Sequence, residues 1–135
     1  MTTRAIGTFQ VRLIPLAADA EENGNTLSRL AIEKEFRGDL EGSSKGEMLS
    51  AGTQTKGSAG YVAQERVTGT LGGLRGSFVL QHTGVMTRGA PGLTITVVPD
   101  SGTGDLAGLA GAMSIIIEAG KHSYEFDYEI TSAAP

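Results

Sequence analysis

The sequence predicts an all-β protein whose strands close into a single eight-stranded antiparallel β-barrel over residues 1–135. Its apolar runs are short, alternate with polar residues and end at Gly, Asn, Asp, Ser or Pro, which is typical of strands. No window of about 12 residues shows the apolar period of a helix. Glycine is frequent, with 20 residues in 135 and no regular repeat, which is typical of tight turns and crowded strand corners.

Eight segments have the strand pattern, and turn-forming residues bound each of them. They are 4–14, 27–40, 44–54, 59–71, 74–88, 92–98, 110–119 and 122–130. Between the first two, residues 15–26 contain AADAEE, which fits a helical turn or a surface loop. Gly72 and Gly73 suit a two-residue hairpin turn, and Gly120 is the centre of a second tight hairpin. The Gly-rich residues 99–111 form a longer connection.

Eight short strands joined mainly by hairpins must hide the edges of their sheet. Closure into an up-and-down barrel and packing as a sandwich both achieve this. Eight strands is also about the number at which a closed barrel either holds one small ligand or fills with its own side chains. We therefore expect a barrel, with either a hollow or a filled interior.

The alternation of the last segment separates its two faces. In HSYEFDYEI one face is aromatic and the other carries three acidic residues, so the aromatic face is expected inside. This interior set is His122, Tyr124, Phe126, Tyr128 and Ile130. Its aromatic stripe fits a wall for a hydrophobic ligand or an ordinary core. His122 directly follows a tight turn, where it suits the surface or a position over the barrel end.

Two further segments place a polar residue inside. In RGSFVLQHTGVM the more apolar face contains Phe78, Leu80 and His82, which puts His82 inside the barrel and Gln81 outside. In LSRLAIEKEF the same reasoning puts Lys34 inside, between apolar neighbours on its face. An imidazole and an ammonium group are thus expected in the interior.

The segment GYVAQERVTGTL has two faces of similar character. The slightly more apolar face contains Tyr61 and Glu65, so Glu65 is expected inside. A shift of one residue would reverse every side chain and place Gln64, Arg66 and Gln81 inside instead.

Longer motifs resemble a known family. The stretch YVAQERVTGTLGGLRGSFVLQHTGVM, the turn GTGDLAGLAG and the closing GKHSYEFDY resemble the bacterial domain-of-unknown-function family 3224, and FRGDLEGSSKGEML extends the similarity over nearly the whole chain. Val85 stands where this family usually has Thr. The resemblance implies a closed barrel like that of allene oxide cyclase and the dirigent proteins, and a homo-oligomer, which is common among such barrels. It implies no activity, because a shared barrel does not carry a function.

The polar interior residues form a candidate site. Glu65 and His82 are the candidate catalytic residues, because a buried carboxylate beside an imidazole can act as general base and acid in a lumen that excludes water. The candidate ligand-binding residues are Lys34, Tyr61, Phe78, Tyr124 and Phe126. The alternative is a structural ion pair of Lys34 and Glu65, with His82 bonded to a tyrosine hydroxyl, in a barrel filled with its own side chains.

Composition argues against several other classes. The chain has no cysteine and only two histidines, without metal-ligand spacing, so neither a metal nor another cofactor is expected. A net charge of −4 without a basic block argues against a nucleic-acid partner. Since no signal peptide or apolar run of membrane-spanning length is present, we expect a cytoplasmic protein with no membrane partner.

These observations predict a protein that binds a small hydrophobic ligand in its lumen and, if it is an enzyme, isomerises or cyclises it without a cofactor. One alternative is a non-catalytic structural or interaction module that acts through the surface of its oligomer. Another is a lipocalin-like carrier with an open apolar lumen. A deep lumen with Glu65 and His82 in its wall favours the first function, and a filled barrel favours the interaction module.

Overall fold

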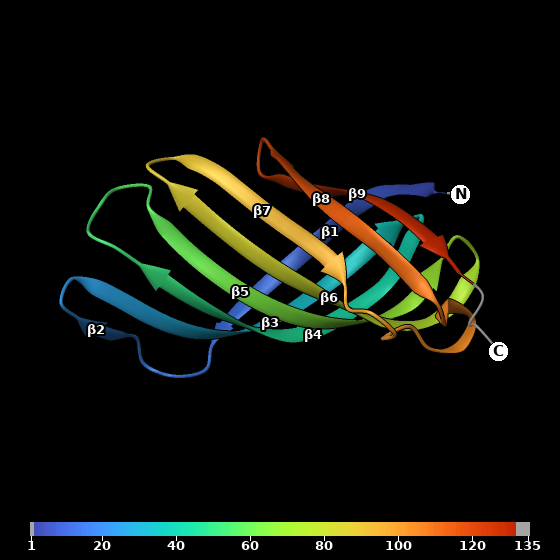
Figure 1. Ribbon diagram of the computed structural model, residues 1–135, viewed down its shortest axis with the longest axis horizontal. Helices are drawn as coiled ribbons and strands as arrows, with labels where there is room; N and C mark the ends of the chain where they lie inside the picture. Colours follow the sequence, from blue (N-terminus) through green and yellow to red (C-terminus); the bar gives the residue numbers. More distant parts are fainter. Residues whose placement is uncertain (1, 132–135) are drawn as a thin grey trace.

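The chain folds almost entirely into long β-strands (Figure 1). The structure, a computed structural model, describes residues 2–131. The strands are β1 (Thr3–Pro15), β2 (Ala20–Glu22), β3 (Asn25–Gly38), β4 (Leu40–Gly52), β5 (Ala59–Leu71), β6 (Leu74–Thr87), β7 (Ala90–Val97), β8 (Leu109–Glu118) and β9 (Lys121–Ile130), with a short 3₁₀ helix η1 (Gly104–Leu106) before β8. Within residues 2–131, none of the helical structure is long and apolar enough to cross a membrane.

The sheet closes on itself, which confirms the predicted eight-stranded antiparallel barrel. Neighbouring strands pair in sequence order from β3 to β9, and β1 completes the ring by pairing with β9 on one side and β3 on the other. The short β2 is an additional strand that pairs only with the start of β3. Closure removes the sheet edges of the ring, so the sandwich alternative is not adopted.

The two hairpin turns expected from glycine are present. Gly72 and Gly73 both have positive φ, at 56° and 86°, as the mirror-image turn between β5 and β6 requires. Ala119 and Gly120 have φ of 51° and 78° between β8 and β9. These turns fix the register of the strands that carry the polar interior residues.

Two expectations about the chain before residue 50 need correction. Residues 15–26 were expected to contain a helical turn or a surface loop; residues 16–19 are an exposed loop, but residues 20–22 form β2, because Asn23 and Gly24 adopt positive φ and turn the chain back as a hairpin. The turn between the second and third predicted segments lies at Asp39 rather than at residues 41–43, because Gly38 has a φ of 111° and the Asp39 carboxylate accepts a hydrogen bond from the backbone N–H of Ile6.

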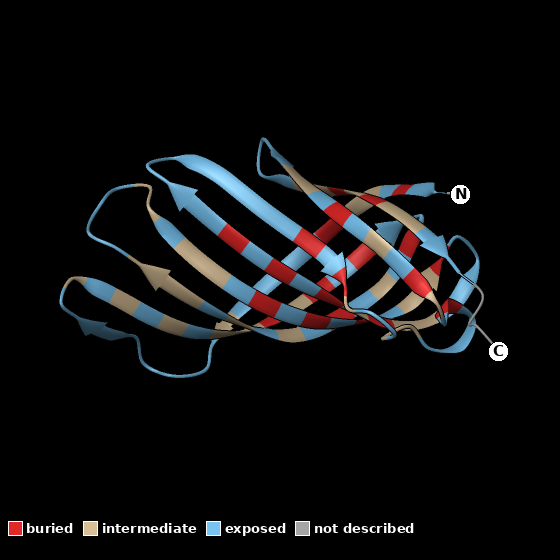
Figure 2. Cartoon of the chain, in the orientation of Figure 1, coloured by how far each residue is buried: buried red, intermediate tan, exposed pale blue. Residues whose placement is uncertain are grey.

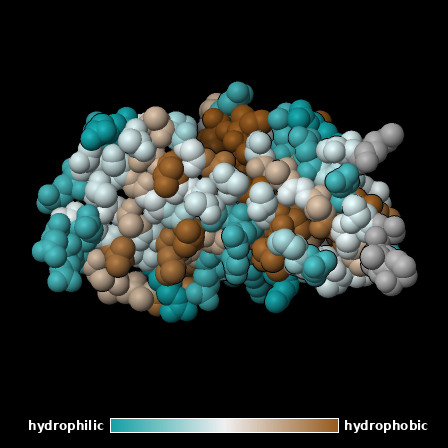
Figure 3. All heavy atoms as spheres, in the orientation of Figure 1, coloured by the Kyte–Doolittle hydropathy of each residue, from teal (hydrophilic) through white to brown (hydrophobic). Residues whose placement is uncertain are grey.

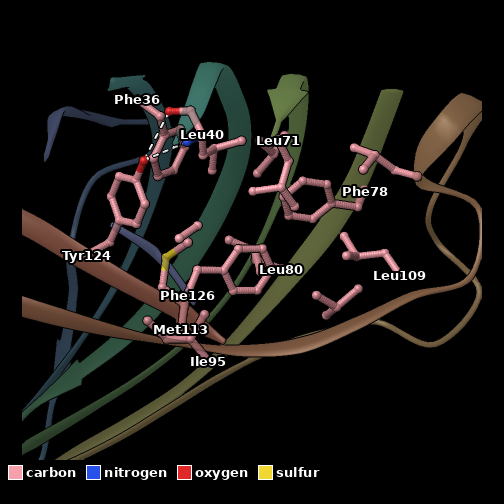
Figure 4. Packing of buried hydrophobic residues seen from close by; sticks show 14 of the residues in the cluster. Phe36, Leu40, Leu71, Phe78, Leu80, Ile95, Leu109, Met113, Tyr124 and Phe126 are labelled. Atoms are coloured by element: carbon pink, nitrogen blue, oxygen red, sulfur yellow. Dashed lines mark hydrogen bonds between the residues drawn. The ribbon is translucent and has the colours of Figure 1, made fainter. Parts of the chain in front are cut away.

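One half of the barrel is filled by large side chains and is called the packed half (Figure 4). Its residues include Phe36, Leu40, Val67, Leu71, Phe78, Leu80, Leu106, Leu109, Tyr124 and Phe126. The rings of Phe78 and Phe126 stack with centroids 5.8 Å apart. The Tyr124 hydroxyl accepts a hydrogen bond from the backbone N–H of Leu40 and lies within bonding distance of the Leu40 carbonyl, so it ties β9 to the turn after β3.

The pairing of β7 with β8 is the weakest joint in the ring. Within the described chain these strands pair only at Ile95 with Met113 and at Thr96 with Ala112, whereas β8 pairs with β9 along its whole length. The early part of β7 and the late part of β8 therefore diverge. We call this joint the β7–β8 seam.

Candidate functional site

The half of the barrel away from the chain termini is hollow. Figure 2 shows buried residues gathered toward the end where β1 begins and β9 ends, while the strands are largely half-buried or exposed toward the β4–β5 and β6–β7 connections. A cavity of about 480 Å³ occupies this end. We call it the hollow half, and its lining is Phe9, Val11, Leu13, Ile32, Lys34, Met48, Ser50, Ala59, Gly60, Tyr61, His82, Gly84, Val85, Met86, Pro91, Gly92, Leu93, Ile115, Ile117 and His122.

Strand alternation makes the cavity walls almost entirely apolar. Leu13 on β1, Leu93 on β7 and Ile117 on β8 point inward, yet they are 49%, 44% and 64% exposed because nothing fills the space between them. The cavity wall also contains several small residues, whereas large aromatic rings fill the packed half. The small residues are Ser50, Ala59, Gly60, Gly84 and Gly92. The hollow half therefore opens to solvent and offers apolar surface to a ligand.

A cluster of four polar side chains lies between the two halves, and we call it the buried charge cluster: Lys34, Ser44, Glu65 and His82. Each is at most 7% exposed. The Glu65 carboxylate accepts hydrogen bonds from Lys34 Nζ at 2.8 Å and Ser44 Oγ at 2.7 Å, and its Oε2 lies 2.6 Å from His82 Nε2. Among the described residues, no buried side-chain nitrogen or oxygen lacks a partner, so this cluster satisfies the requirement for burying charge.

The neighbours of Glu65 decide its ionisation. Burial alone would raise the pKa of this carboxyl group, but the hydrogen bond with His82, the positive charge and hydrogen bond of Lys34, and the hydrogen bond of Ser44 outweigh it and lower the pKa to about 2. Glu65 is therefore ionised at neutral pH. Because a carboxylate with so low a pKa is a weak base, Glu65 is poorly suited to the general-base role expected from the sequence.

The ionised carboxylate also fixes the hydrogen bonds of His82. Glu65 offers only lone pairs, so His82 Nε2 carries the hydrogen of their bond. In the neutral imidazole Nδ1 is then an acceptor, and the Tyr61 hydroxyl, 3.2 Å away, donates to it. Burial and the nearby negative charge of Glu65 raise the pKa of Tyr61, so its phenol keeps its proton. A chain of hydrogen bonds runs from Glu65 through His82 to Tyr61 at the cavity wall.

Lys34 and His82 form the inner end of the cavity. Both line it, whereas Glu65 lies behind them and does not. The Lys34 ammonium is 5.0 Å from the ring centroid of Phe9 and 5.8 Å from that of Phe36, distances at which an aromatic ring attracts a cation. The site is thus an apolar chamber that ends on an ammonium and an imidazole.

The structure brings four of the predicted site residues together and separates three others from them. Lys34, Tyr61, Glu65 and His82 all face the interior in the expected register, so the alternative with Arg66 inside is wrong. The three remaining candidates for ligand binding, Phe78, Tyr124 and Phe126, lie in the packed half and do not line the cavity. Large rings fill that half and leave no room there for a ligand.

Sequence reasoning missed much of the cavity wall. Phe9, Val11 and Leu13 alternate with Gln10 and Arg12 in the first strand, and this pattern was sufficient to place them inside. His122, for which two positions were open, is half-buried at the wall, with its ring centroid 5.3 Å from that of Phe9. The sequence did not indicate that Ser44 lies inside. The residues two positions before and after it are glycines, which suit either face of a strand.

Metal binding has no support in this arrangement. Among the described residues, no group of three His, Asp or Glu side chains is placed to hold a metal ion. The one buried carboxylate and the imidazole beside it are already bonded to each other and to Lys34.

Comparisons with known proteins agree with the fold. A family model described as "Protein of unknown function (DUF3224)" matches residues 5–128. A search of curated proteins gives no match. Among solved structures, a protein of unknown function from the DUF3224 family of Shewanella oneidensis MR-1 is 52% identical, with 98% of this chain and 100% of that chain covered and a TM-score of 0.95. This chain therefore belongs to the DUF3224 family of proteins of unknown function.

Proposed function

We propose that this protein binds a small hydrophobic molecule in the hollow half of its barrel. The observation that carries the proposal is the cavity of about 480 Å³ with nearly continuous apolar walls. Its volume lies within the range of about 300–1,000 Å³ that small-molecule sites occupy. The combination of a mostly apolar chamber and a few convergent polar groups is also typical of such sites.

The energetic basis of the proposal is the apolar surface that the cavity leaves in contact with water. Leu13, Met86, Leu93 and Ile117 remain between 42% and 64% exposed although their side chains point inward. A ligand that covers them gains about 25 cal/mol for each Å² of apolar surface removed from water. The packed half supplies the rigid support that a preformed cavity needs.

Binding is the proposed function and catalysis is not part of it. The low pKa of Glu65 makes this carboxylate a counterion for Lys34 rather than a proton acceptor. The alternative function, an interaction module, would need a continuous hydrophobic area on the outer surface where a partner can bind. On the face shown in Figure 3 the hydrophobic side chains form several separate groups among hydrophilic ones.

A neutral fluorescent dye, Nile red, provides the test. We expect saturable binding with one site per chain. Leu13→Gln, a substitution inside the cavity, should weaken binding by roughly tenfold, since it places a polar amide against the dye. Ile6→Gln is the matched control, because Ile6 lies on the same strand with 56% exposure but outside the cavity.

Two results would contradict the proposal. One is the absence of saturable Nile red binding, and the other is an equal effect of the Leu13 and Ile6 substitutions. Native mass spectrometry of the protein purified from its own host is the complementary measurement, because it reports a bound small molecule and the number of subunits together. A clean oligomer without a ligand, combined with no dye binding, would favour the interaction module.

A further inference from the structure

The inner end of the cavity has hydrogen-bond donors to spare, and they belong to Lys34. An ammonium group has three N–H donors. Among the described residues, Lys34 Nζ has one hydrogen-bond acceptor, Glu65 Oε2, at 2.8 Å. The Lys34 side chain is only 6% exposed and lines the cavity. Two N–H donors of this nearly buried cation therefore have no hydrogen-bond acceptor among the described residues. Besides Glu65, the protein groups that attract the cation are the aromatic rings of Phe9 and Phe36.

The other polar hydrogens at this end are already used. Ser44 donates to Glu65 Oε1, and His82 Nε2 donates to Glu65 Oε2. The Tyr61 hydroxyl and His82 Nδ1 are hydrogen-bonded to each other at 3.2 Å. Within the buried charge cluster, the spare donors that a ligand can reach are therefore those of Lys34.

The charges of the cluster restrict what the ligand can bring. The positive charge of Lys34 and the negative charge of Glu65 cancel, so their ion pair brings no net charge to the inner end of the cavity. A carboxylate would add an uncompensated negative charge to an apolar chamber, and an alkylammonium would place a second cation beside Lys34. Both are costly in a site of low polarity. A neutral hydrogen-bond acceptor adds no charge and accepts hydrogen bonds from the free N–H donors of Lys34.

From these observations, and resting on the proposed binding function, we infer that the ligand class is a neutral carbonyl compound with an apolar body. Its carbonyl oxygen accepts hydrogen bonds from Lys34 at the inner end of the cavity. Its hydrocarbon part lies against Leu13, Ile32, Met48 and Ile115 toward the open end. Glu65 does not line the cavity; its hydrogen bond holds the Lys34 ammonium in place.

The test compares probes of equal chain length by their displacement of Nile red: octyl methyl ketone, the alkane, the primary alkylamine and the carboxylate. We expect the ketone to displace the dye at concentrations at least about tenfold lower than the amine or the carboxylate at neutral pH, because it accepts a hydrogen bond from a charged donor without adding a charge. The alkane serves as a measure of the apolar contribution.

Variants identify the group responsible. Lys34→Met together with Glu65→Gln removes both charges and leaves no unpaired ion in the interior. This double variant should lower the affinity for the ketone by about tenfold and leave the affinity for the alkane unchanged or higher. Lys45→Met is the matched control, because Lys45 lies on β4 next to Ser44 but is exposed on the outside.

The outcomes separate this inference from the proposed function. If ketone and alkane both bind but the double variant changes them equally, the carbonyl assignment is overturned and the hydrophobic site stands. If no probe binds and Nile red does not bind either, the proposed function itself fails. If the double variant does not fold, a spectroscopic measurement on the unmodified protein tests the same assignment. The carbonyl stretching band of an isotopically labelled ketone should lie at lower frequency in the bound state than in alkane solution. A bound ketone whose band stays at the alkane position would overturn the assignment.

Discussion

Oε2 of Glu65 lies 2.6 Å from Nε2 of His82 and 2.8 Å from Nζ of Lys34, so a single oxygen atom joins an imidazole and an ammonium inside the barrel. Because Glu65 is fully buried, this carboxylate is stable as an anion only while its donors stay in place. The cluster thus couples the folding of four strands, β3, β4, β5 and β6, to the ionisation of one group. This coupling has measurable consequences for stability.

The first prediction concerns acid. The pKa of Glu65 is about 2 in the folded protein and 4.5 in the unfolded reference. A folded pKa below the unfolded value means that the stabilisation is fully present above pH 4.5 and is lost as the pH falls through this value toward 2. We expect the free energy of unfolding to decrease by about 3 kcal/mol over this interval on account of Glu65. Urea unfolding at a series of pH values, followed by circular dichroism, measures the decrease.

Glu65→Gln should flatten this pH dependence and lower the stability at neutral pH. The matched control is Asp127→Asn, which removes a carboxylate whose pKa is also lowered, by its hydrogen bond with Arg4, but which lies at the surface. Because solvent screens the surface pair, the control should retain most of the acid dependence. Equal flattening in both variants would show that Glu65 is not the group responsible.

A second prediction concerns the pair of Lys34 and Glu65. Lys34→Met leaves the Glu65 carboxylate buried without its main cation, and we expect a loss of about 3–5 kcal/mol in the free energy of unfolding. Adding Glu65→Gln removes the unpaired charge, so the double variant should recover much of that loss. A double-mutant cycle by urea unfolding measures the coupling energy. Additive effects of the two substitutions would mean that the 2.8 Å contact contributes nothing specific.

The third prediction concerns the Tyr124 hydroxyl. Tyr124→Phe removes the acceptor of the Leu40 N–H and the donor to the turn carbonyls, and we expect a loss of about 1–3 kcal/mol because a buried N–H is left unpaired. Tyr128→Phe is the control, since the described residues show no hydrogen bond to its hydroxyl, and it should change stability by less than about 0.5 kcal/mol. Similar losses in both variants would show that the hydrogen bonds of the Tyr124 hydroxyl are not the cause.

The fourth prediction concerns Gly46, which is paired with Glu65 across β4 and β5. A Cβ atom at Gly46 would collide with the backbone carbonyl of Gln64, so the glycine permits close approach of two strands beside the buried charge cluster. Gly46→Ala should destabilise the fold by roughly 1–3 kcal/mol. Gly52→Ala, on the same strand but with nothing within 4 Å of the added atom, should not. Thermal unfolding of both variants decides this, and a tolerated alanine at 46 would contradict the close approach.

Much of the interior was predictable from the sequence because a strand alternates between two faces. The acidic residues of HSYEFDYEI identify the outside of β9, and the same rule correctly placed Lys34, Glu65 and His82 inside. Their contact with one another was not predictable from alternation alone. Lys34 is on β3 and Glu65 is on β5, with β4 between them, so their meeting depends on the position of each residue along three paired strands.

The division into packed and hollow halves was also beyond the sequence pattern. Both halves have apolar inward positions, and the aromatic stripe of β9 suited a ligand wall as well as a core. What separates the halves is residue size: Phe78 and Phe126 meet across the packed half, whereas the small residues Ser50, Ala59 and Gly60 line the cavity. Side-chain volume at facing positions becomes informative only when the order and register of the strands are known.

The last prediction concerns the β7–β8 seam. Pairing there is limited to residues 95–96 of β7 and 112–113 of β8, so backbone groups of residues 90–94 and 114–118 that point across the seam lack a partner strand. Leu93 and Ile117 line the cavity beside the same stretch, which places the seam directly at the ligand chamber. Hydrogen exchange measured by mass spectrometry should therefore be faster in β7 and β8 than in β4, which pairs on both sides along its length.

Binding provides the decisive comparison at this seam. A ligand in the hollow half contacts both strands and stabilises their bound arrangement, so saturating Nile red should slow exchange in residues 90–97 and 109–118 more than in β4. Slowing confined to the seam strands would show that the ligand stabilises this weakly paired part of the ring. If β7 and β8 exchange as slowly as β4 in the absence of ligand, the prediction is contradicted, because the barrel is then equally stable around its ring.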